Sequence, residues 1–539
     1  MANSKPWLNH YSAKVPLHIE YPQIPLQDIL HKSALAYPEK TAIAYGEREI
    51  SYAEFDALSN QFANSLIELD LEKGSRVAIF LPNIPQFIIA YFGVLKAGAV
   101  ITAMSPFYRE REVEHQLRDS GAEAIVALES LYPILAAVGQ KTKIRNVILT
   151  GLGDYSLENA LSPTVSNTLS FKPLVEAASQ NRPALQFNPD EDLAALQYTG
   201  GTTGISKGAM LTHTNLISNA LAFAAWIHGR TAQETFLTAL PLFHIYGMTT
   251  SMTVPVSLAA KMVLLPRFEP VKAMQAIQRR KVTVFCGVPT MYQMLLESTE
   301  LDKYDLTSIR VCISGASTLH PQTQTSFMEN TGSFLAEGYG LTEASPVTHC
   351  TPVDRTLRTV KVGSIGLPLP DTDAKIVDLE TGEELAQGET GELAVKGPQV
   401  MKGYWEKPEE TALVLRDGWL LTGDIAHMDK DGYFFITDRK KDLIKSKNYS
   451  VYPRELEDII YEHPSVKLCA VVGKPDQLAG EIPKAYIVLK EGMAMSAEEI
   501  MVFVNEKVAS YKSIREVEFR KELPISSAGK VLKRVLQSR

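Results

Sequence analysis

The chain has 539 residues, of which 45% are apolar and 22% charged, and its formal net charge is −8. That length exceeds what one hydrophobic core normally serves, so we expect a soluble globular protein of two or more domains. The negative charge argues against nucleic acid as a partner, since nucleic-acid-binding domains are usually basic. Four widely spaced cysteines form no CxxC or zinc pattern and no signal peptide is evident, which together favour a cytoplasmic location.

Helices and buried strands alternate along the first 150 residues. Their spacing predicts helices at 26–36, 52–69 and 86–96, and strands at 41–45, 77–81, 124–128 and 147–150. The apolar stretch at 87–104 is interrupted by Lys96 and two glycines, so a helix followed by a strand explains it better than a membrane span. Such alternation predicts parallel sheets covered by helices on both faces. Residues 151–190 are polar and rich in Pro and Ser, which predicts a surface excursion.

An apolar run at 193–196 leads into Tyr198-Thr-Gly-Gly-Thr-Thr-Gly-Ile-Ser-Lys-Gly208. The glycines can expose consecutive backbone N–H groups, while the hydroxyls add donors and Lys207 adds a positive charge. This composition predicts a loop that holds a polyphosphate. The loop does not fit the Walker A pattern, because Ser206 stands where that pattern needs its second glycine. A flexible surface turn is the alternative that composition alone leaves open.

The alternation resumes after this loop, and Thr214 is the predicted N-cap of a helix over 215–227. Further buried strands are predicted at 235–240, 261–265, 282–286, 309–314 and 334–337. Short strands between Gly, Pro and Asp turns at 363–396 predict a small β-barrel or sheet. After a strand at 432–437, the remaining segments predict a small α+β unit. We place the boundary at 438–441, which gives an N-terminal domain of residues 1–438 and a C-terminal domain of residues 439–539.

Three motifs follow predicted strands of the N-terminal domain. His244, in Leu240-Pro-Leu-Phe-His-Ile-Tyr-Gly247, is a candidate to orient a substrate, with an ordinary half-buried histidine as the alternative. The small residues of Ser314-Gly-Ala316 offer a backbone surface for a flat ring, since ligands of open α/β sheets bind beyond the carboxyl ends of strands. The alternative there is a simple strand-to-helix turn.

The third motif is Glu337-Gly-Tyr-Gly-Leu-Thr-Glu-Ala-Ser345. In it, Tyr339 is a candidate to stack on a purine and Thr342 to bond an oxyanion. Glu343 is a candidate ligand of Mg²⁺, which favours hard oxygen ligands and typically combines one or two carboxylates with substrate phosphates. A solvated surface carboxylate is the alternative for Glu343.

Three candidates come later in the chain. Asp424, at the end of Asp417-Gly-Trp-Leu-Leu-Thr-Gly-Asp424, can accept hydrogen bonds from a ribose diol, or can simply be a turn residue. Arg439 lies in the charged run 438–445 and can reach ribose or phosphate, although such runs are usually solvated. Lys530 follows a flexible Ser-Ser-Ala-Gly turn and can swing into a site on another domain, but a lone tail lysine is usually exposed.

Taken in order, these segments resemble the adenylate-forming superfamily of acyl-CoA synthetases, luciferases and peptide-synthetase adenylation domains. The resemblance covers residues 25–535. Residues 417–441 are similar to the fatty-acyl-CoA synthetase signature. Lys5-Pro-Trp7 and Gln399-Val-Met-Lys-Gly-Tyr-Trp405 are similar to bacterial long-chain fatty-acid–CoA ligases.

The resemblance implies a fold and an activity. The fold is α/β, with a large N-terminal domain of two doubly wound βα subdomains plus a small β-barrel, followed by a small mobile α+β C-terminal domain. The activity is an acid–thiol ligase, in which a fatty acid attacks ATP to form acyl-AMP and pyrophosphate, and CoA then displaces AMP. The partners are therefore a long- or medium-chain fatty acid, ATP and CoA, with Mg²⁺ as a cofactor. Weak peripheral membrane contact and a homodimer stay open.

The resemblance also implies roles for individual residues. The implied catalytic residues are Lys530, Glu343, Thr342, Lys207 and His244, and the implied metal ligands are Glu343 and Thr202. Lys441 matches the hinge about which the C-terminal domain turns. The implied nucleotide-binding residues are Thr199, Gly200, Gly201, Thr202, Thr203, Gly204, Ser206, Lys207, Gly315, Ala316, Glu337, Gly338, Tyr339, Gly340, Thr342, Asp424, Ile436, Arg439, Lys445 and Lys530.

One departure concerns the CoA step. Relatives usually carry glycine in the loop before Tyr449, whereas this chain has Lys447 and Asn448, whose side chains stand where the pantetheine arm should pass. Two alternatives to a fatty-acid–CoA ligase therefore stay open. One is a ligase of the same fold for another acyl or aryl acid, and the other is an enzyme that stops at acyl-AMP. A non-catalytic acyl or nucleotide sensor is a third, against which the joint presence of Lys207, Glu343 and Lys530 argues.

Overall fold

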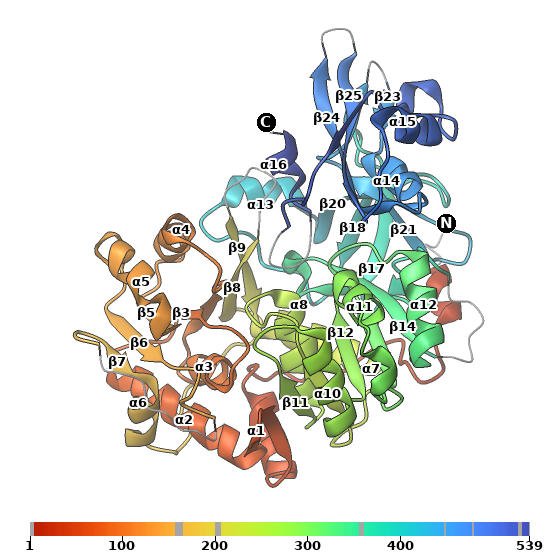
Figure 1. Ribbon diagram of the computed structural model, residues 1–539. Coiled ribbons are helices and arrows are strands. Elements are labelled where there is room, and N and C mark those ends of the chain that lie inside the picture. Colours follow the sequence, from red (N-terminus) through yellow and green to blue (C-terminus); the bar gives the residue numbers. More distant parts are fainter. Residues whose placement is uncertain are drawn as a thin grey trace. The chain divides into compact units, whose positions relative to one another are not determined.

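The computed structural model describes residues 5–156, 165–199, 206–354, 361–446, 449–476, 479–525 and 531–537 (Figure 1). The chain forms two compact units. The large unit comprises residues 1–373 and 396–420, and the small unit comprises residues 374–395 and 421–539. Parallel sheets fill the large unit and an α+β arrangement forms the C-terminal part, which confirms the predicted fold class. The predicted domain boundary at 438–441 stays a prediction.

The first sheet of the large unit has seven strands. Their order is β7 (Leu169–Ser170), β6 (Asn146–Thr150), β5 (Ala124–Leu128), β3 (Arg76–Phe80), β4 (Val100–Ala103), β8 (Leu193–Thr199) and β9 (Lys207–Thr212). All neighbours are parallel except β8 and β9, which form an antiparallel hairpin at the edge. The predicted parallel arrangement is confirmed for this part of the chain.

Helices cover both faces of the first sheet (Figure 1). Helices α4 (Glu110–Ser120) and α5 (Tyr132–Val138) lie on one side, where they share an apolar cluster with β3, β5 and β6. Helices α2 (Tyr52–Glu68), α3 (Pro85–Lys96) and α6 (Phe171–Ala177) lie on the other. Every residue of α3 is buried, including Lys96, whose ammonium group donates to Asp56, Ser59 and Asn60. The interrupted apolar stretch is thus the predicted packed helix, α3, followed by β4.

The second sheet has nine strands. Their order is β16 (Leu367–Pro368), β15 (Val347–Cys350), β14 (Leu335–Gly340), β13 (Val311–Ser314), β12 (Val284–Gly287), β10 (Thr235–Thr238), β11 (Lys261–Leu264), β1 (Thr41–Tyr45) and β2 (Arg48–Ser51). The strands from β14 to β1 are parallel, and the outer pairs are antiparallel. The carboxyl ends of the parallel strands therefore meet at one edge of this sheet.

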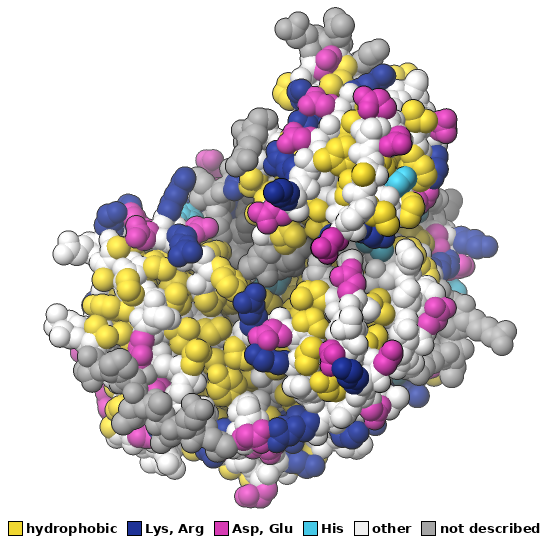
Figure 2. All heavy atoms as spheres, in the orientation of Figure 1, with side chains coloured by type: hydrophobic (Ala, Val, Ile, Leu, Met, Phe, Trp, Pro, Cys, Tyr) yellow, Lys and Arg dark blue, Asp and Glu magenta, His cyan; other side chains and the backbone are white. Residues whose placement is uncertain are grey.

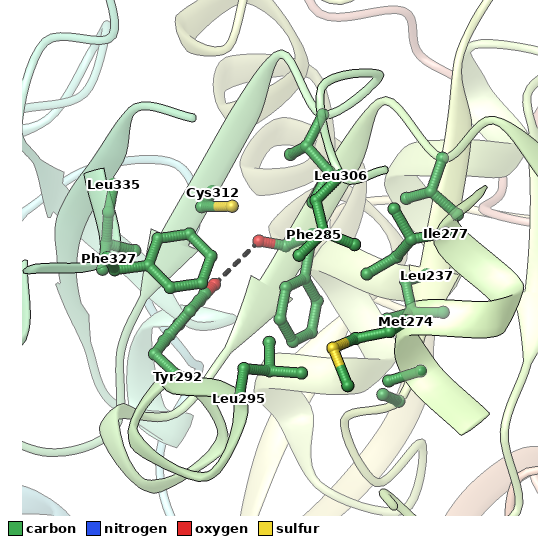
Figure 3. Close-up of a cluster of buried hydrophobic side chains, with 14 of the residues drawn as sticks. Leu237, Met274, Ile277, Phe285, Tyr292, Leu295, Leu306, Cys312, Phe327 and Leu335 are labelled. Carbon is green, nitrogen blue, oxygen red and sulfur yellow. Dashed lines mark hydrogen bonds between the residues drawn. The ribbon is translucent and has the colours of Figure 1, made fainter. Parts of the chain in front are cut away.

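An aromatic cluster packs one face of the second sheet against three helices (Figure 3). These helices are α10 (Pro270–Arg280), α11 (Pro289–Leu296) and α12 (Pro321–Thr331). The ring of Tyr292 lies 5.0 Å from those of Phe285 and Phe327, and its hydroxyl donates to the backbone oxygen atoms of Phe285 (2.9 Å) and Ile313 (3.0 Å). This buried hydroxyl is satisfied, so the cluster can fix β12 and β13, and the end of β13 carries predicted site residues.

The other helices of the large unit are α1 (Asp28–Ala36), α7 (His213–Trp226), α8 (Ile245–Met248), α9 (Val254–Ser257) and α13 (Pro408–Val414), and β19 (Leu415–Arg416) pairs with the start of β20. A single π-helical turn at Thr249–Thr253 joins α8 and α9.

The small unit contains two sheets. One includes β17 (Asp373–Val377), β18 (Gly391–Lys396), β20 (Trp419–Met428) and β21 (Phe434–Arg439). The other contains β22 (Ile444–Ser446), β23 (Tyr449–Val451), β24 (Val466–Asp476), β25 (Gly480–Leu489) and β26 (Glu516–Phe519). Its helices are α14 (Pro453–Tyr461), α15 (Ala497–Asn505) and α16 (Lys533–Gln537).

Two predictions about local structure were wrong. The N-cap of α7 is Thr212, whose hydroxyl accepts from the Asn215 N–H group (3.1 Å), while Thr214 donates to Asp190. Thr212 is the N-cap because its N–H group also donates to the Asn215 side chain, which completes a reciprocal cap. The stretch 151–190 is more than a surface excursion, because it supplies β7 and α6, and α6 buries Phe171 against Phe62.

Charge is mixed over the face of the molecule drawn in Figure 2, where Lys and Arg side chains lie among Asp and Glu. Among the described helices, none combines the length and apolar character needed to cross a membrane.

We predict that buried His213 makes stability fall at acid pH. Its Nδ1 atom accepts from the Leu26 N–H group (3.0 Å), and burial lowers its pKa from 6.5 to about 4. Between these values the unfolded chain binds a proton that the folded chain does not, so stability falls as the pH drops below 6.5. This should cost about 2 kcal/mol at pH 5. His213→Gln should remove this loss, as measured by urea unfolding at pH 7 and pH 5.

A suitable control is exposed His18, whose pKa is raised by its hydrogen bond with Asp371. Its contribution is present at low pH and is lost as the pH rises, so His18→Gln should not relieve the acid loss. An unchanged pH dependence in His213→Gln would contradict the assignment of the acid sensitivity to His213.

Candidate active site

The glycine-rich loop is held at both ends by the β8–β9 hairpin. Thr199 ends β8 and pairs with Lys207, the first residue of β9. The Ser206 hydroxyl donates to the Thr199 oxygen (2.7 Å), which closes the hairpin just before Lys207. Five of the predicted binding residues lie outside the described part of the chain: Gly200, Gly201, Thr202, Thr203 and Gly204. The structure thus places the two ends of the loop, and the phosphate-binding role stays a prediction.

Side chains from α4 and β8 hold this hairpin in place through hydrogen bonds. The Tyr198 hydroxyl donates to Asp119 (2.7 Å), and a ring nitrogen of His115 lies 2.9 Å from the Ser206 oxygen. A Cβ atom at Gly208 would lie 3.2 Å from the Tyr198 ring, so a small residue suits this position.

Residues 401–405 extend the hairpin along the free edge of β9. Tyr404 pairs with Ala209, and backbone N–H groups donate from Met210 to Gly403 (2.9 Å) and from Trp405 to Gly208 (2.8 Å). This added segment brings the Tyr404 ring to 5.0 Å from the Lys207 ammonium, within range of a cation–π interaction. The same ammonium pairs with Glu410 of α13.

Glu343 is joined to Lys207 through Tyr404. The Tyr404 hydroxyl donates to a carboxylate oxygen of Glu343 (2.7 Å), and the Met401 N–H group donates to its backbone oxygen (2.8 Å). The structure thus brings together two residues that are 136 positions apart in the chain, 343 minus 207, around one aromatic ring.

The single carboxylate of Glu343 suits a metal ion that takes most of its ligands from a bound substrate and not from the protein. No group of three or more His, Cys, Asp or Glu side chains within the described ranges could form an all-protein metal site. Glu343 is one partly buried carboxylate beside the predicted phosphate loop. Mg²⁺ is typically held in this way, by one or two carboxylates together with substrate phosphates, so the residues present fit the predicted ion.

The carboxyl ends of three parallel strands carry the next group of predicted residues. His244 follows β10, Gly315 and Ala316 follow β13, and Glu337 to Gly340 complete β14. Because β10, β12, β13 and β14 are parallel, these segments share one edge of the second sheet, where open α/β sheets bind ligands. Ala316 has a left-handed backbone (φ 69°), a strained conformation that is often found at functional sites.

Close backbone approach explains two of the glycines. A Cβ atom at Gly340 would lie 2.0 Å from the Pro346 oxygen, so no larger residue fits there without moving the chain. A Cβ atom at Gly315 would lie 3.0 Å from the ring of Tyr246. The Tyr246 hydroxyl donates to the Ile313 oxygen (3.1 Å), which holds the His244 segment against the end of β13.

His244 is a neutral, structural hydrogen-bond acceptor at physiological pH. Its Nδ1 atom accepts from the Tyr246 N–H group (3.2 Å) and caps α8. Burial lowers its pKa to about 4, which leaves the imidazole unprotonated at neutral pH. Orientation of a ligand therefore suits this residue better than donation of a proton. The turn after α8 is tied to the Glu343 segment, since the Thr249 hydroxyl donates to the Ser345 oxygen (2.8 Å).

The remaining predicted residues of β14 lie at the end of this strand. Glu337 is buried and accepts from the Leu319 N–H group (3.4 Å), while Gly338 packs over Ile313. The partly buried Tyr339 ring makes an edge contact with His349 (5.9 Å). Thr342 begins the short helical turn that also carries Glu343.

In the small unit, the structure brings two predicted residues together. Asp424 and Arg439 are opposite each other on β20 and β21, with 3.2 Å between the guanidinium Nε and a carboxylate oxygen. Ile436 lies on the same strand as Arg439. Lys445 on β22 is exposed, and its N–H group donates to Glu481 (2.8 Å). Lys530 lies outside the described residues.

Sequence reasoning missed Tyr404 and Glu410. The segment Gly403-Tyr-Trp-Glu-Lys-Pro-Glu-Glu410 carried a detectable signal, since Pro408 predicts a helix start and the acidic residues beside it suit a first turn. Nothing in that signal indicates that Tyr404 and Glu410 contact Lys207, because the contact depends on the pairing of residues 401–405 with β9.

Comparison with known proteins gives consistent matches over nearly the whole chain. Residues 30–405 match the family described as AMP-binding enzyme, and residues 455–530 match the AMP-binding enzyme C-terminal domain. The chain is 42% identical to a long-chain-fatty-acid–CoA ligase of Bacillus subtilis (strain 168), covering 99% of this chain and 98% of that protein. It is 38% identical, with the same coverage, to the protein of that name from Salmonella typhimurium.

Solved structures give the same result. The crystal structure of ATP-bound MatB from Rhodopseudomonas palustris is similar with a TM-score of 0.87 and 32% identity, covering 96% of this chain and 99% of that one. A benzoate CoA ligase from Burkholderia xenovorans LB400 has a TM-score of 0.84 and 26% identity, covering 95% and 100%. The chain therefore belongs to the AMP-binding enzyme family, the adenylate-forming superfamily that its motifs indicated.

Proposed function

We propose that this chain is an AMP-forming ligase that joins a long- or medium-chain fatty acid to CoA at the expense of ATP. The observation that carries the proposal is the full-length likeness to two long-chain-fatty-acid–CoA ligases at 42% and 38% identity. The position of Lys207 at the end of the glycine-rich loop supports it, because a polyphosphate needs a positive charge there, and Tyr404 holds Glu343, the candidate metal ligand, close to this lysine.

In the first half-reaction, a carboxylate oxygen of the fatty acid attacks the α-phosphorus of ATP, and the bond to the β-phosphate oxygen breaks. Acyl-AMP and pyrophosphate result. Lys207 and the loop that it follows would bind the β- and γ-phosphates, which leave as pyrophosphate. Lys530 would lie between the fatty-acid carboxylate and the α-phosphate, where negative charge gathers in the transition state.

Glu343 would hold Mg²⁺, which when bound offsets the negative charge of the phosphates. The Tyr404 hydroxyl already bonds to this carboxylate and would keep it oriented toward the loop. Neutral His244 would line the approach of the fatty acid without exchanging a proton.

In the second half-reaction, the CoA thiol attacks the acyl carbonyl carbon and AMP leaves. Our proposal includes a rotation of the C-terminal domain about Lys441, which exchanges Lys530 for the 442–450 loop with Lys445. Lys447 and Asn448 lie outside the described residues, so the structure gives no position for these two. Their bulk favours one alternative, an enzyme that stops at acyl-AMP.

We also propose that the protein is located in the cytoplasm. All four cysteines are buried and free, which suits a reducing cytoplasm. Weak peripheral membrane contact and a homodimer stay predictions.

A pyrophosphate-release assay with saturated fatty acids of graded length tests the proposal. We expect release that depends on the fatty acid, followed by AMP release that depends on CoA. Release with aryl acids alone would favour the ligase for another acid. Pyrophosphate release without any effect of CoA would favour the enzyme that stops at acyl-AMP, and no turnover with any acid would favour a sensor.

Lys530→Ala should separate the two half-reactions. Loss of one donor to the developing charge should slow pyrophosphate release by on the order of 100-fold. The CoA-dependent conversion of supplied acyl-AMP should stay close to that of the parent enzyme, because this step follows the departure of Lys530. Exposed Lys521 offers a matched control, and Lys521→Ala should alter neither rate. Equal loss of both half-reactions in Lys530→Ala would rule out the assigned role.

Lys441→Pro should have the opposite pattern. A proline fixes φ and restricts the residue before it, so the hinge should turn less readily. We expect slower CoA-dependent release of AMP at a preserved rate of pyrophosphate release, both measured in single-turnover experiments. An unaffected CoA step would count against Lys441 as the hinge.

A further inference from the structure

The ammonium group of Lys207 has an anionic partner on its own unit. It forms an ion pair with Glu410, in the first turn of α13, while the Tyr404 ring lies beside it at 5.0 Å. The Lys207 side chain is only 12% exposed and that of Glu410 is 36% exposed, so the pair is partly shielded from water. Partial burial makes such a pair stronger than one at the surface.

Backbone pairing sets the position of this carboxylate. Residues 401–405 pair with β9, the strand that begins with Lys207. Thr411, within α13, ties the helix to the turn before it, because its hydroxyl accepts from the Tyr404 N–H group (2.9 Å) and donates to the Lys407 oxygen (2.8 Å). Because hydrogen bonds fix both ends of this turn, Glu410 is presented to Lys207 by the fold and not by the chance position of a surface side chain.

The pair conflicts with the proposed task of Lys207. If Lys207 binds the β- and γ-phosphates, the Glu410 carboxylate and the phosphates compete for one cation. The carboxylate also repels the phosphates, since like charges at close range in a partly buried site are unfavourable. Nucleotide binding must therefore weaken the ion pair, and the departure of pyrophosphate must allow it to form again.

We propose that Glu410 is a positioning residue that holds Lys207 while the phosphate site is empty and exchanges it for the phosphates when nucleotide binds. This inference rests on the proposed function, which supplies the phosphates. Tyr404 contacts both Lys207 and Glu343, so it keeps the two groups near each other in both situations. The exchange lowers the affinity for pyrophosphate and thereby aids its release after adenylation.

Binding of inorganic pyrophosphate with Mg²⁺ to the full chain, measured by calorimetry, tests this role without any turnover. Glu410→Gln keeps the size of the side chain and removes the competing charge. It should lower the dissociation constant about threefold to fivefold, the range expected for a partly exposed ion pair. Glu409→Gln is the matched control, because Glu409 is the exposed neighbour with the same charge. It should change the dissociation constant less than twofold, since an exposed charge contributes little.

A second pair of variants shows whether Glu410 acts through Lys207. In a Lys207→Met background, Glu410→Gln should change pyrophosphate binding no more than Glu409→Gln does. In the parent background, Glu410→Gln should also lower the KM for ATP without raising kcat, because a tighter product leaves more slowly.

Weaker or unaltered pyrophosphate binding in Glu410→Gln would overturn the proposal. A full effect that persists without Lys207 would overturn it as well. Failure of the proposed function is a separate result: if the parent chain released no pyrophosphate with any fatty acid, that function would fall. The calorimetric comparison would still decide the role of Glu410.

Discussion

The pairing of residues 401–405 with β9 is the interaction on which the candidate active site of the large unit depends. It continues the β8–β9 hairpin by one more segment, so that a single set of backbone hydrogen bonds fixes both the end of the phosphate loop and the ring of Tyr404. That ring then joins Lys207 to Glu343. Lys207, which we propose binds the phosphates, and Glu343, which we propose binds the metal, are thereby linked through one ring, an arrangement that would provide the preorganisation that electrostatic catalysis requires.

The second sheet supplies the other half of this site through the ends of its parallel strands. Its parallel strands end at a common edge, and side chains beyond β10, β13 and β14 meet there without needing a dedicated support. Two close contacts tie that edge to the Glu343 segment: the Thr249 hydroxyl with the Ser345 oxygen, and the backbone of Gly340 with that of Pro346. Burial lowers the pKa of His244 to about 4, so this side chain carries no charge at this edge at neutral pH and can act there as a hydrogen-bond acceptor.

Much of this architecture could be predicted from the sequence, because apolar periodicity and glycine-rich turns are local signals. The packed helix α3 and the strand ends that carry Gly315 and Tyr339 were visible in this way, while the phosphate-binding role of the loop before Lys207 stays a prediction. Sheet membership was not, since β1 joins the second sheet by pairing with β11 more than two hundred positions later. The Tyr404–Lys207 and Glu410–Lys207 contacts were invisible for the same reason. The cap at Thr212 was missed because Thr212 and Thr214 offered similar local signals, and only the reciprocal bonds with Asn215 distinguish them.

In the proposed reaction, the fatty acid is activated when its carboxylate forms a bond to the α-phosphorus of ATP. The most direct test is to supply a fatty acid with both carboxylate oxygens labelled with ¹⁸O, together with ATP and CoA, and to analyse the products by mass spectrometry. Because the oxygen that attacks phosphorus leaves with AMP, we expect one labelled oxygen in AMP and the other in the acyl-CoA thioester. Label in inorganic phosphate, or unlabelled AMP beside a doubly labelled acid, would contradict it.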